Sequence, residues 1–206
     1  MQLQRPFAAI TPTVDGDVLG VLASTHTEHT ASRLAELIPT RSLNGIRNAA
    51  ERLVAHGTVV ARDVGRVRTY ALNDEHLFAS ELRAIARPTA ALLDRIAEQV
   101  SRWASPPDFG AVFGSAARAE MREDSDIDIL LVSPRGASDE WVSDVAALTH
   151  RVTAMTGNDA RILDLEVDDL RSEAHAPLLR AVVNDGLVFA GSTTWLRRQL
   201  RKEAMT

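Results

Sequence analysis

Two adjacent residues in the second half of the chain, Gly114 and Ser115, are of the types that bind phosphate groups. They follow an apolar segment, residues 110–113, and a helix is predicted to begin at this point. Glycine allows a phosphate to approach the backbone closely. Free N–H groups at the start of a helix attract anions, and the serine hydroxyl adds a further donor. The pattern therefore predicts a site for the phosphates of a nucleoside triphosphate.

A pair of carboxylates follows about ten residues later. Asp126 and Asp128 stand two positions apart at the beginning of an apolar strand over residues 127–132. Side chains at this spacing point to one face, with Cα atoms roughly 6.5 Å apart. Two such carboxylates repel each other unless a positive charge lies between them, and Mg²⁺ prefers oxygen ligands. We expect Mg²⁺ here, as two ions ~4 Å apart that hold the attacking and leaving oxygens.

The two motifs together resemble the signature of the DNA polymerase beta nucleotidyltransferase superfamily, and most closely its minimal nucleotidyltransferase branch. The resemblance covers roughly residues 108–190 and depends on Gly114-Ser115-x-x-Arg118 followed by Ser125-Asp126-x-Asp128. It implies that Gly114, Ser115, Arg118 and Ser125 bind the nucleotide, whereas Asp126 and Asp128 bind the metal ions. Arg118 could instead face solvent or pair with a nearby acid.

The resemblance also implies a third carboxylate on a later strand, which binds metal and helps to activate the attacking hydroxyl. Asp164 is our candidate, because apolar neighbours on both sides predict a buried mid-strand position; Glu166 lies on the same face. A structural or surface role for Asp164 is equally open. The family often has glycine after the arginine, where this chain has Ala119, and this departure leaves open a weakened or repurposed site.

These residues need a layered domain to position them. Short strands are expected at residues 110–113, 127–132, 160–167 and 187–190. Helices are expected at residues 139–155, 176–184 and 194–202. Strands interleaved with helices predict an α/β (α+β) domain, a small mixed sheet flanked by helices, over residues 105–206.

The first 74 residues have a different pattern. Helices are expected over residues 15–23 and after the N-caps Thr30 and Ser42, with strands at 59–62 and 67–72 joined by a turn. This order resembles a winged helix-turn-helix over residues 18–72. We therefore predict a winged helix-turn-helix domain at 1–74 and a helical linker at 75–104.

Charge is unevenly distributed along the chain. Residues 41–72 contain six arginines and two acids, a charge of +4, which leaves −9 for the remainder of a chain of net charge −5. Arginines on a helix and a wing can contact DNA phosphates, and Asn and Arg can read base edges. A solvated face in an arginine-biased protein is the alternative. The candidate DNA-binding residues are Arg41, Asn44, Arg47, Asn48, Arg62, Arg66 and Arg68.

Composition excludes several classes of protein. The chain has no cysteine, which rules out disulfides, Cys-ligated zinc and a thiol nucleophile. Its apolar runs are too short for a membrane helix or a signal peptide, so we expect a cytoplasmic protein with no membrane partner.

Two functional hypotheses remain compatible with these observations. In the first, an Mg²⁺-dependent enzyme transfers a nucleotidyl group from a nucleoside triphosphate to a hydroxyl of RNA, a protein or a small molecule. In the second, a DNA-binding regulator or toxin–antitoxin component, for which we expect a homodimer, senses nucleotide without turnover. A pure protein-interaction module would do neither.

Overall fold

The protein, described by a computed structural model over residues 1–201, divides into two compact units. One contains Gln2 and residues 4–88, and the other contains Met1, Leu3 and the residues from Thr89 onward. The segment predicted as a linker, residues 75–104, is divided between them. Ala79 is buried in the core of the first unit, whereas Ile96 is buried in the core of the second. Each helix of this segment has an apolar face, which is stabilised by burial in the core of its own unit.

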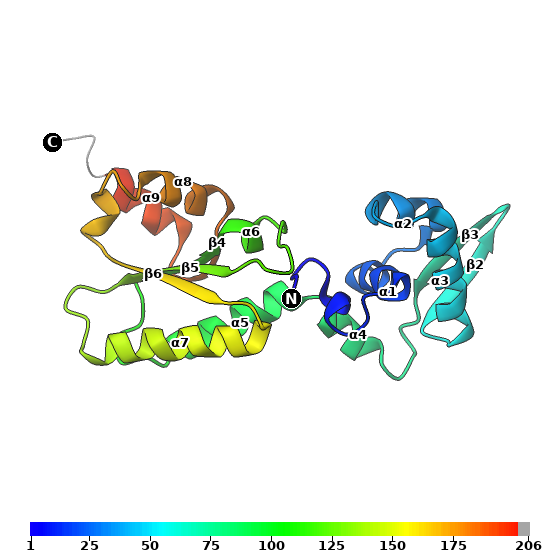
Figure 1. The fold of residues 1–206 in the computed structure, drawn as a ribbon, viewed down its shortest axis with the longest axis horizontal. Coiled ribbons are helices and arrows are strands. Elements are labelled where there is room, and N and C mark those ends of the chain that lie inside the picture. Colours follow the sequence, from blue (N-terminus) through cyan, green and yellow to red (C-terminus); the bar gives the residue numbers. More distant parts are fainter. Residues whose placement is uncertain (202–206) are drawn as a thin grey trace. The chain divides into compact units, whose positions relative to one another are not determined.

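The N-terminal unit consists of short helices and a small antiparallel sheet of strand order β1-β3-β2 (Figure 1). Its elements are η1 (Pro6–Ala9), α1 (Val14–Ser24), β1 (His29–Thr30), α2 (Ala31–Leu37), α3 (Leu43–Ala55), β2 (Val59–Val64), β3 (Val67–Leu72) and α4 (Ala79–Ile85). The expected helices and hairpin are present, and the two-residue strand β1 was not expected.

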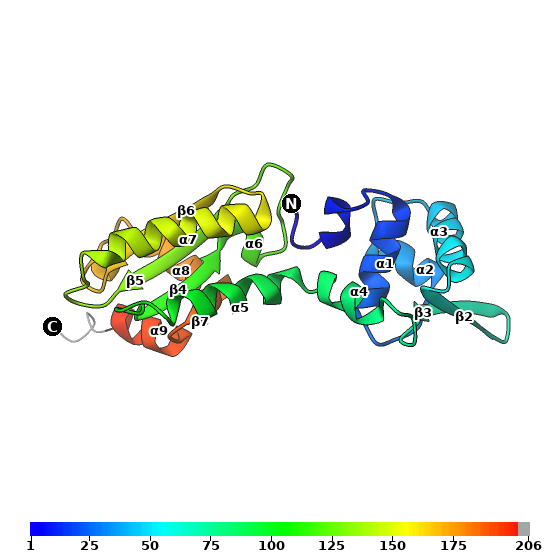
Figure 2. The same cartoon turned by 90° about the horizontal axis from the view of Figure 1, so that it is seen from below.

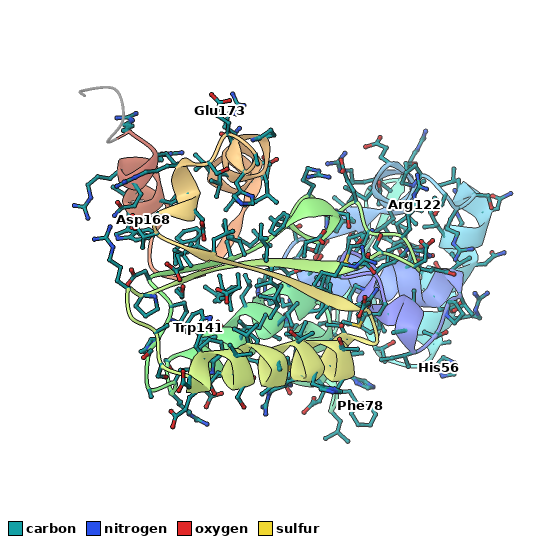
Figure 3. All side chains as sticks on the ribbon, turned by 60° about the vertical axis from the view of Figure 1, so that its left-hand side comes forward. His56, Phe78, Arg122, Trp141, Asp168 and Glu173 are labelled. Carbon is teal, nitrogen blue, oxygen red and sulfur yellow. The ribbon has the colours of Figure 1, made fainter. Side chains whose placement is uncertain are left out.

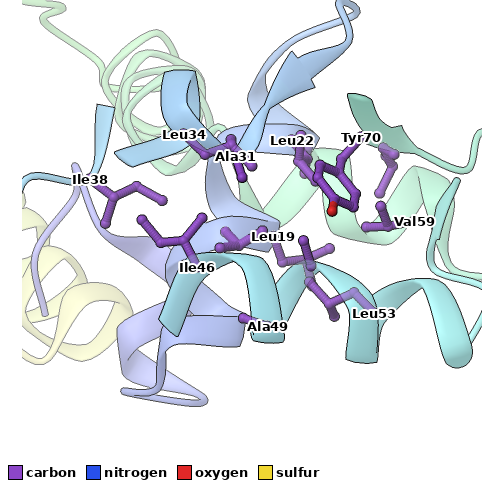
Figure 4. Close-up of a cluster of buried hydrophobic side chains, with 14 of the residues drawn as sticks. Leu19, Leu22, Ala31, Leu34, Ile38, Ile46, Ala49, Leu53, Val59 and Tyr70 are labelled. Atoms are coloured by element: carbon purple, nitrogen blue, oxygen red, sulfur yellow. The ribbon is translucent and has the colours of Figure 1, made fainter. Parts of the chain in front are cut away.

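Local sequence signals set the starts of two of these helices. The Thr30 hydroxyl accepts a hydrogen bond of 3.1 Å from Arg33 N, and the Ser42 hydroxyl accepts one of 3.2 Å from Gly45 N. Both are the N-caps expected from the sequence. The apolar faces of the helices then pack against Tyr70 of β3 in one core (Figure 4).

The C-terminal unit is built on a four-stranded mixed sheet of order β6-β5-β4-β7. Strands β5 and β6 are parallel, and β4 is antiparallel to both of its neighbours. The elements are α5 (Pro88–Val100), β4 (Phe109–Phe113), α6 (Gly114–Ala117), β5 (Ile127–Ser133), α7 (Glu140–Thr156), β6 (Ala160–Glu166), η2 (Asp169–Arg171), α8 (Ala176–Asp185), β7 (Leu187–Ala190) and α9 (Thr193–Arg201). The expected strands and helices are confirmed to within two residues, although the expected helix end at Lys202 lies outside the described residues.

Helices cover both faces of this sheet (Figures 1 and 2). Ile129 and Leu131 of β5 belong to the core that includes residues of α5 and α7, whereas Leu130 and Val132 belong to the core that includes residues of α8 and α9. The central strand is therefore buried on both sides, which explains its continuous apolar run. Within residues 1–201, no helix is long and apolar enough to cross a membrane.

The central position of β5 leads to a stability prediction. Leu130 is fully buried, so we expect Leu130→Ala to lower the free energy of unfolding by about 2–5 kcal/mol through lost burial and a cavity. Urea denaturation followed by tryptophan fluorescence measures this change. Val142→Ala is the matched control: Val142 is 74% exposed, and we expect a change within about 0.5 kcal/mol. Equal effects of the two substitutions would contradict the described core.

Candidate active site

The corner between β4 and α6 brings Gly114 against the carboxylate of Asp128. Phe113, the last residue of β4, is the register partner of Asp128 on β5. Gly114 has φ +71°, and a Cβ atom at this position would lie 2.5 Å from Asp128 Oδ2. A residue with a Cβ atom would adopt an unfavourable backbone conformation here and would force the Asp128 carboxylate to move. Glycine is thus required here for both a positive φ and close approach, and the carboxylate faces the corner predicted to hold phosphate.

The Asp128 carboxylate is half-buried and has a second carboxylate nearby. Burial raises the pKa of Asp128, and the negative charge of Asp126 raises it further, whereas the positive charge of Arg161 lowers it. Burial disfavours the charged form of an acid, and a neighbouring like charge has the same effect. The acid pair is therefore a place where an added cation would be stabilised.

Arg161 provides the positive charge at this site. Its Nη1 lies 2.8 Å from Asp126 Oδ2, and its Nε lies 3.6 Å from Asp159 Oδ2. On the sheet, Arg161 is the register partner of Asp128 across the parallel β5–β6 pair. The sequence alone does not single out Arg161, because its position depends on a strand register that no local pattern reveals.

Asp164 is not at this site, and the prediction that it completes the carboxylate set is wrong. Its register partner is Leu131, whose side chain packs in the core on the α7 side of the sheet. Asp164 Oδ2 accepts a 2.7 Å hydrogen bond from Trp141 Nε1 of α7. Figure 3 shows Trp141 on this side of the sheet, opposite the side that carries Glu173. As a residue, Asp164 is exposed, whereas the sequence predicts a buried mid-strand position. Glu166 lies on the same face of the strand as Asp164, because side chains two positions apart point the same way.

The local environment of Asp164 explains why its pKa is raised, and no catalytic role is needed for this explanation. Partial burial raises its pKa, the hydrogen bond from Trp141 lowers it, and the charge of Asp169 raises it. The carboxylate thus acts as the acceptor for a buried indole N–H, which is a structural function.

The other residues predicted to bind nucleotide lie around the Gly114 corner and differ in their hydrogen-bond and ion-pair partners. The Ser115 hydroxyl makes no hydrogen bond within the described part of the chain, so it is available as a donor. Arg118 is exposed and pairs with Glu120 at 2.9 Å, the alternative considered from the sequence. The Ser125 hydroxyl accepts a 2.7 Å hydrogen bond from Arg122 N and thereby stabilises the turn before Asp126.

Asn158 is a buried residue that fixes the approach to Asp126. Its Nδ2 donates a 2.6 Å hydrogen bond to Ser125 O, and its side chain is almost completely buried. The next residue, Asp159, accepts a 2.8 Å hydrogen bond from Ile127 N through its backbone carbonyl. The turn after α7 therefore positions the residues on both sides of Asp126.

Ala119 lies in the left-handed backbone region, with φ +56°. This conformation is disfavoured for a residue with a Cβ atom, whereas glycine adopts it freely. It gives a physical reason for the glycine that the family often has at this position, and it shows that the loop keeps its shape despite alanine.

Asp126, Asp128 and the Gly114 corner together suit a divalent cation. The two carboxylates offer the oxygen donors that Mg²⁺ prefers, and the Asp128 carboxylate lies directly against Gly114. Among residues 1–201, however, no group of three or more His, Cys, Asp or Glu side chains could hold a metal ion. The described residues thus fit binding through two carboxylates and phosphate.

Comparison with known proteins agrees with this geometry. The family model described as nucleotidyltransferase domain matches residues 93–182. The C-terminal unit therefore has the nucleotidyltransferase fold. A search of curated proteins found no match to this sequence.

Solved structures with a similar fold include two toxin–antitoxin proteins. A toxin–antitoxin solved with AMP-PNP is 19% identical and covers 53% of this chain and 82% of that chain, with a TM-score of 0.41. A mutant of the toxin–antitoxin MntA-HpeT is 17% identical and covers 53% of this chain and 81% of that chain, with a TM-score of 0.40.

The candidate DNA-binding residues of the N-terminal unit fall into two groups. Three arginines are neutralised by ion pairs within the unit: Arg41 with Asp17, Arg62 with Glu28, and Arg68 with Glu51 and Asp63. Asp17 and Glu28 precede residues 41–72 in the chain, so the tertiary fold cancels part of the charge asymmetry of the sequence. The remaining candidates are exposed and make no ion pair in the described structure: Asn44, Arg47, Asn48 and Arg66.

We expect Asn158→Ala to lower the free energy of unfolding by about 1–3 kcal/mol, because it leaves the buried Ser125 carbonyl without its donor. Chemical denaturation measures the change. The control is Asn184→Ala: Asn184 is exposed, and we expect an effect within about 0.5 kcal/mol. A loss of similar size in both variants would show that Asn158 does not stabilise the turn.

We expect Ala119→Gly to raise the free energy of unfolding by roughly 0.5–1 kcal/mol, because relief of left-handed strain exceeds the added flexibility of the unfolded chain. Differential scanning calorimetry of both proteins checks this. Ala117→Gly, within α6, should instead be destabilising by roughly 0.5–1 kcal/mol. Destabilisation by both substitutions would contradict the described loop conformation.

Proposed function

We propose that the C-terminal unit binds a nucleoside triphosphate with Mg²⁺ and transfers its nucleotidyl group to a hydroxyl. The observation that supports this most strongly is the Asp128 carboxylate lying against the Gly114 corner, with Asp126 beside it. This arrangement places metal-binding oxygens next to a backbone that a phosphate can approach. The nucleotidyltransferase family match covers the same residues.

In this proposal, Asp126 and Asp128 bind Mg²⁺, and Gly114 and Ser115 contact the β- and γ-phosphates. A bound Mg²⁺ would neutralise charge on the triphosphate as the transfer proceeds. The acceptor oxygen forms a bond to the α-phosphorus, the bond from that phosphorus to the bridging oxygen breaks, and pyrophosphate leaves. The proton of the acceptor passes to solvent. RNA, a protein side chain and a small molecule are the acceptor classes to test.

The matched pair Asp128→Asn and Asp164→Asn tests this assignment. Both replace one carboxylate by an amide of the same shape, but only Asp128 faces the Gly114 corner. We expect Asp128→Asn to lower Mg²⁺-dependent pyrophosphate release at least about 100-fold through loss of a metal ligand. Asp164→Asn keeps an oxygen acceptor for Trp141 and should remain within about twofold of the wild-type protein.

The assay combines each of the four triphosphates with pools of RNA, protein and small-molecule acceptors. Comparable losses in both variants would overturn the assignment of the two faces. Nucleotide binding by calorimetry, without pyrophosphate release from any combination, would favour the sensing hypothesis over transfer.

A second function, DNA binding by the N-terminal unit, is favoured by the exposed polar face of α3. Asn44, Arg47 and Asn48 lie on this helix without internal ion pairs, and Arg66 lies at the turn of the β2–β3 hairpin. A helix followed by a hairpin is the order of a winged helix-turn-helix, in which side chains of the helix contact base edges and phosphates and the wing contacts phosphates. We therefore propose that these four residues, instead of the full set of arginines, form the DNA-contacting surface.

Salt dependence of binding distinguishes this surface from a generally basic coat. For each of Arg47→Ala and Arg66→Ala, we expect the slope of log K against log salt concentration to fall in magnitude by about 0.9, one phosphate contact each. Fluorescence anisotropy with duplex DNA at several salt concentrations measures the slopes. Arg95→Ala, an exposed arginine of α5, is the control and should leave the slope unchanged. Unchanged slopes in all three variants would exclude the proposed surface.

A further inference from the structure

The face that β6 presents to the site contains an arginine where a third carboxylate was expected. In a parallel strand pair, register partners point to the same side of the sheet. Asp128 is paired with Arg161, and Leu130 is paired with Leu163. The side chains that β6 directs to the Asp128 face are therefore a cation and an apolar group.

Arg161 already occupies one of the two carboxylates. Its Nη1 lies 2.8 Å from Asp126 Oδ2, and its side chain is 65% exposed, whereas that of Asp126 is 27% exposed. A guanidinium remains charged at any physiological pH and donates through several N–H groups. An exposed and flexible arginine can thus exchange a carboxylate partner for a phosphate oxygen, to which it binds well.

A second divalent ion has few ligands at this site. Two ions ~4 Å apart need carboxylates that bridge them and further oxygen ligands for each. The Asp126 carboxylate lies 2.8 Å from Arg161 Nη1 and that of Asp159 lies 3.6 Å from Arg161 Nε, so the guanidinium would repel an ion placed beside either acid. The guanidinium of Arg161 already provides the positive charge that a second ion would provide.

We propose that Arg161 replaces the third carboxylate, so that the site binds one divalent cation with the nucleotide instead of two. Arg161 moves from Asp126 to a phosphate oxygen when the cation binds and supplies the second positive charge. This inference rests on the proposed function of the same site and corrects the expectation of two Mg²⁺ ions. It also makes the cation and Arg161 competitors for Asp126 in the nucleotide-free protein.

Mn²⁺ binding to the full chain, followed by electron paramagnetic resonance of the free ion, tests the proposal without an activity assay. With a saturating non-hydrolysable ATP analogue, we expect one Mn²⁺ per chain in the wild-type protein. Two Mn²⁺ ions per chain would overturn the proposal. Inclusion of the Asp128→Asn variant identifies the ion that depends on this site.

Nucleotide-free titrations separate this inference from the proposed function. Without nucleotide, Arg161→Gln removes the competitor for Asp126, and we expect Mn²⁺ to bind about three- to tenfold more tightly, as for the loss of one exposed ion pair. Arg135→Gln is the matched control, because Arg135 forms an exposed ion pair with Asp168 and should leave the Mn²⁺ affinity unchanged. Equal Mn²⁺ affinity of Arg161→Gln and wild type would overturn the role of Arg161 even if no nucleotide binds.

Discussion

The C-terminal unit depends on the repulsion between two carboxylates that its fold holds close together. Asp128 extends from a strand buried on both sides, and its carboxylate lies against Gly114, whose positive φ favours glycine. Asp126 lies beside Asp128 at the end of a turn. The buried side chain of Asn158 stabilises this turn by donating a hydrogen bond to the backbone carbonyl of Ser125. In the described protein, one arginine offsets this repulsion. Burial and the charge of Asp126 both raise the pKa of Asp128, so a cation added beside this pair would reduce the repulsion.

Ala119, the one non-glycine residue with positive φ in the described structure, lies in the loop that follows this corner. Gly114 and Ala119 both have positive φ, and the Ser125 carbonyl depends on a single buried amide. Such features persist where the surrounding structure over-determines them, and they are common at functional sites. The rigid central sheet, with helices on both faces, supplies that support here. The carboxylate of Asp164 has a structural role instead. It accepts a hydrogen bond from Trp141 and thereby joins α7 to the opposite face of the sheet.

In the N-terminal unit, charge is balanced across the fold instead of along the chain. Asp17 lies on α1 and pairs with both Arg5 and Arg41, although neither arginine is near it in sequence. Ion pairs of this kind contribute little stability when exposed, but they remove arginines from the surface available to an anionic partner. The uncompensated residues on α3 and in the hairpin turn therefore define a smaller and more specific surface than composition indicates.

Features that depend on neighbouring residues could be predicted from the sequence. The caps at Thr30 and Ser42, the strands, and the meeting of Gly114 with Asp128 arise from local propensities and from a pairing of two consecutive strands. The opposite placement of Asp164 and Arg161 could not be predicted, because β5 and β6 are joined through α7 and their register is set by packing. A shift of one residue in that register would exchange the two faces of β6. Sequence thus determined the acidic pair and the glycine-serine corner beside it, whereas the tertiary structure decided that Arg161, and not Asp164, lies on the Asp128 face of β6.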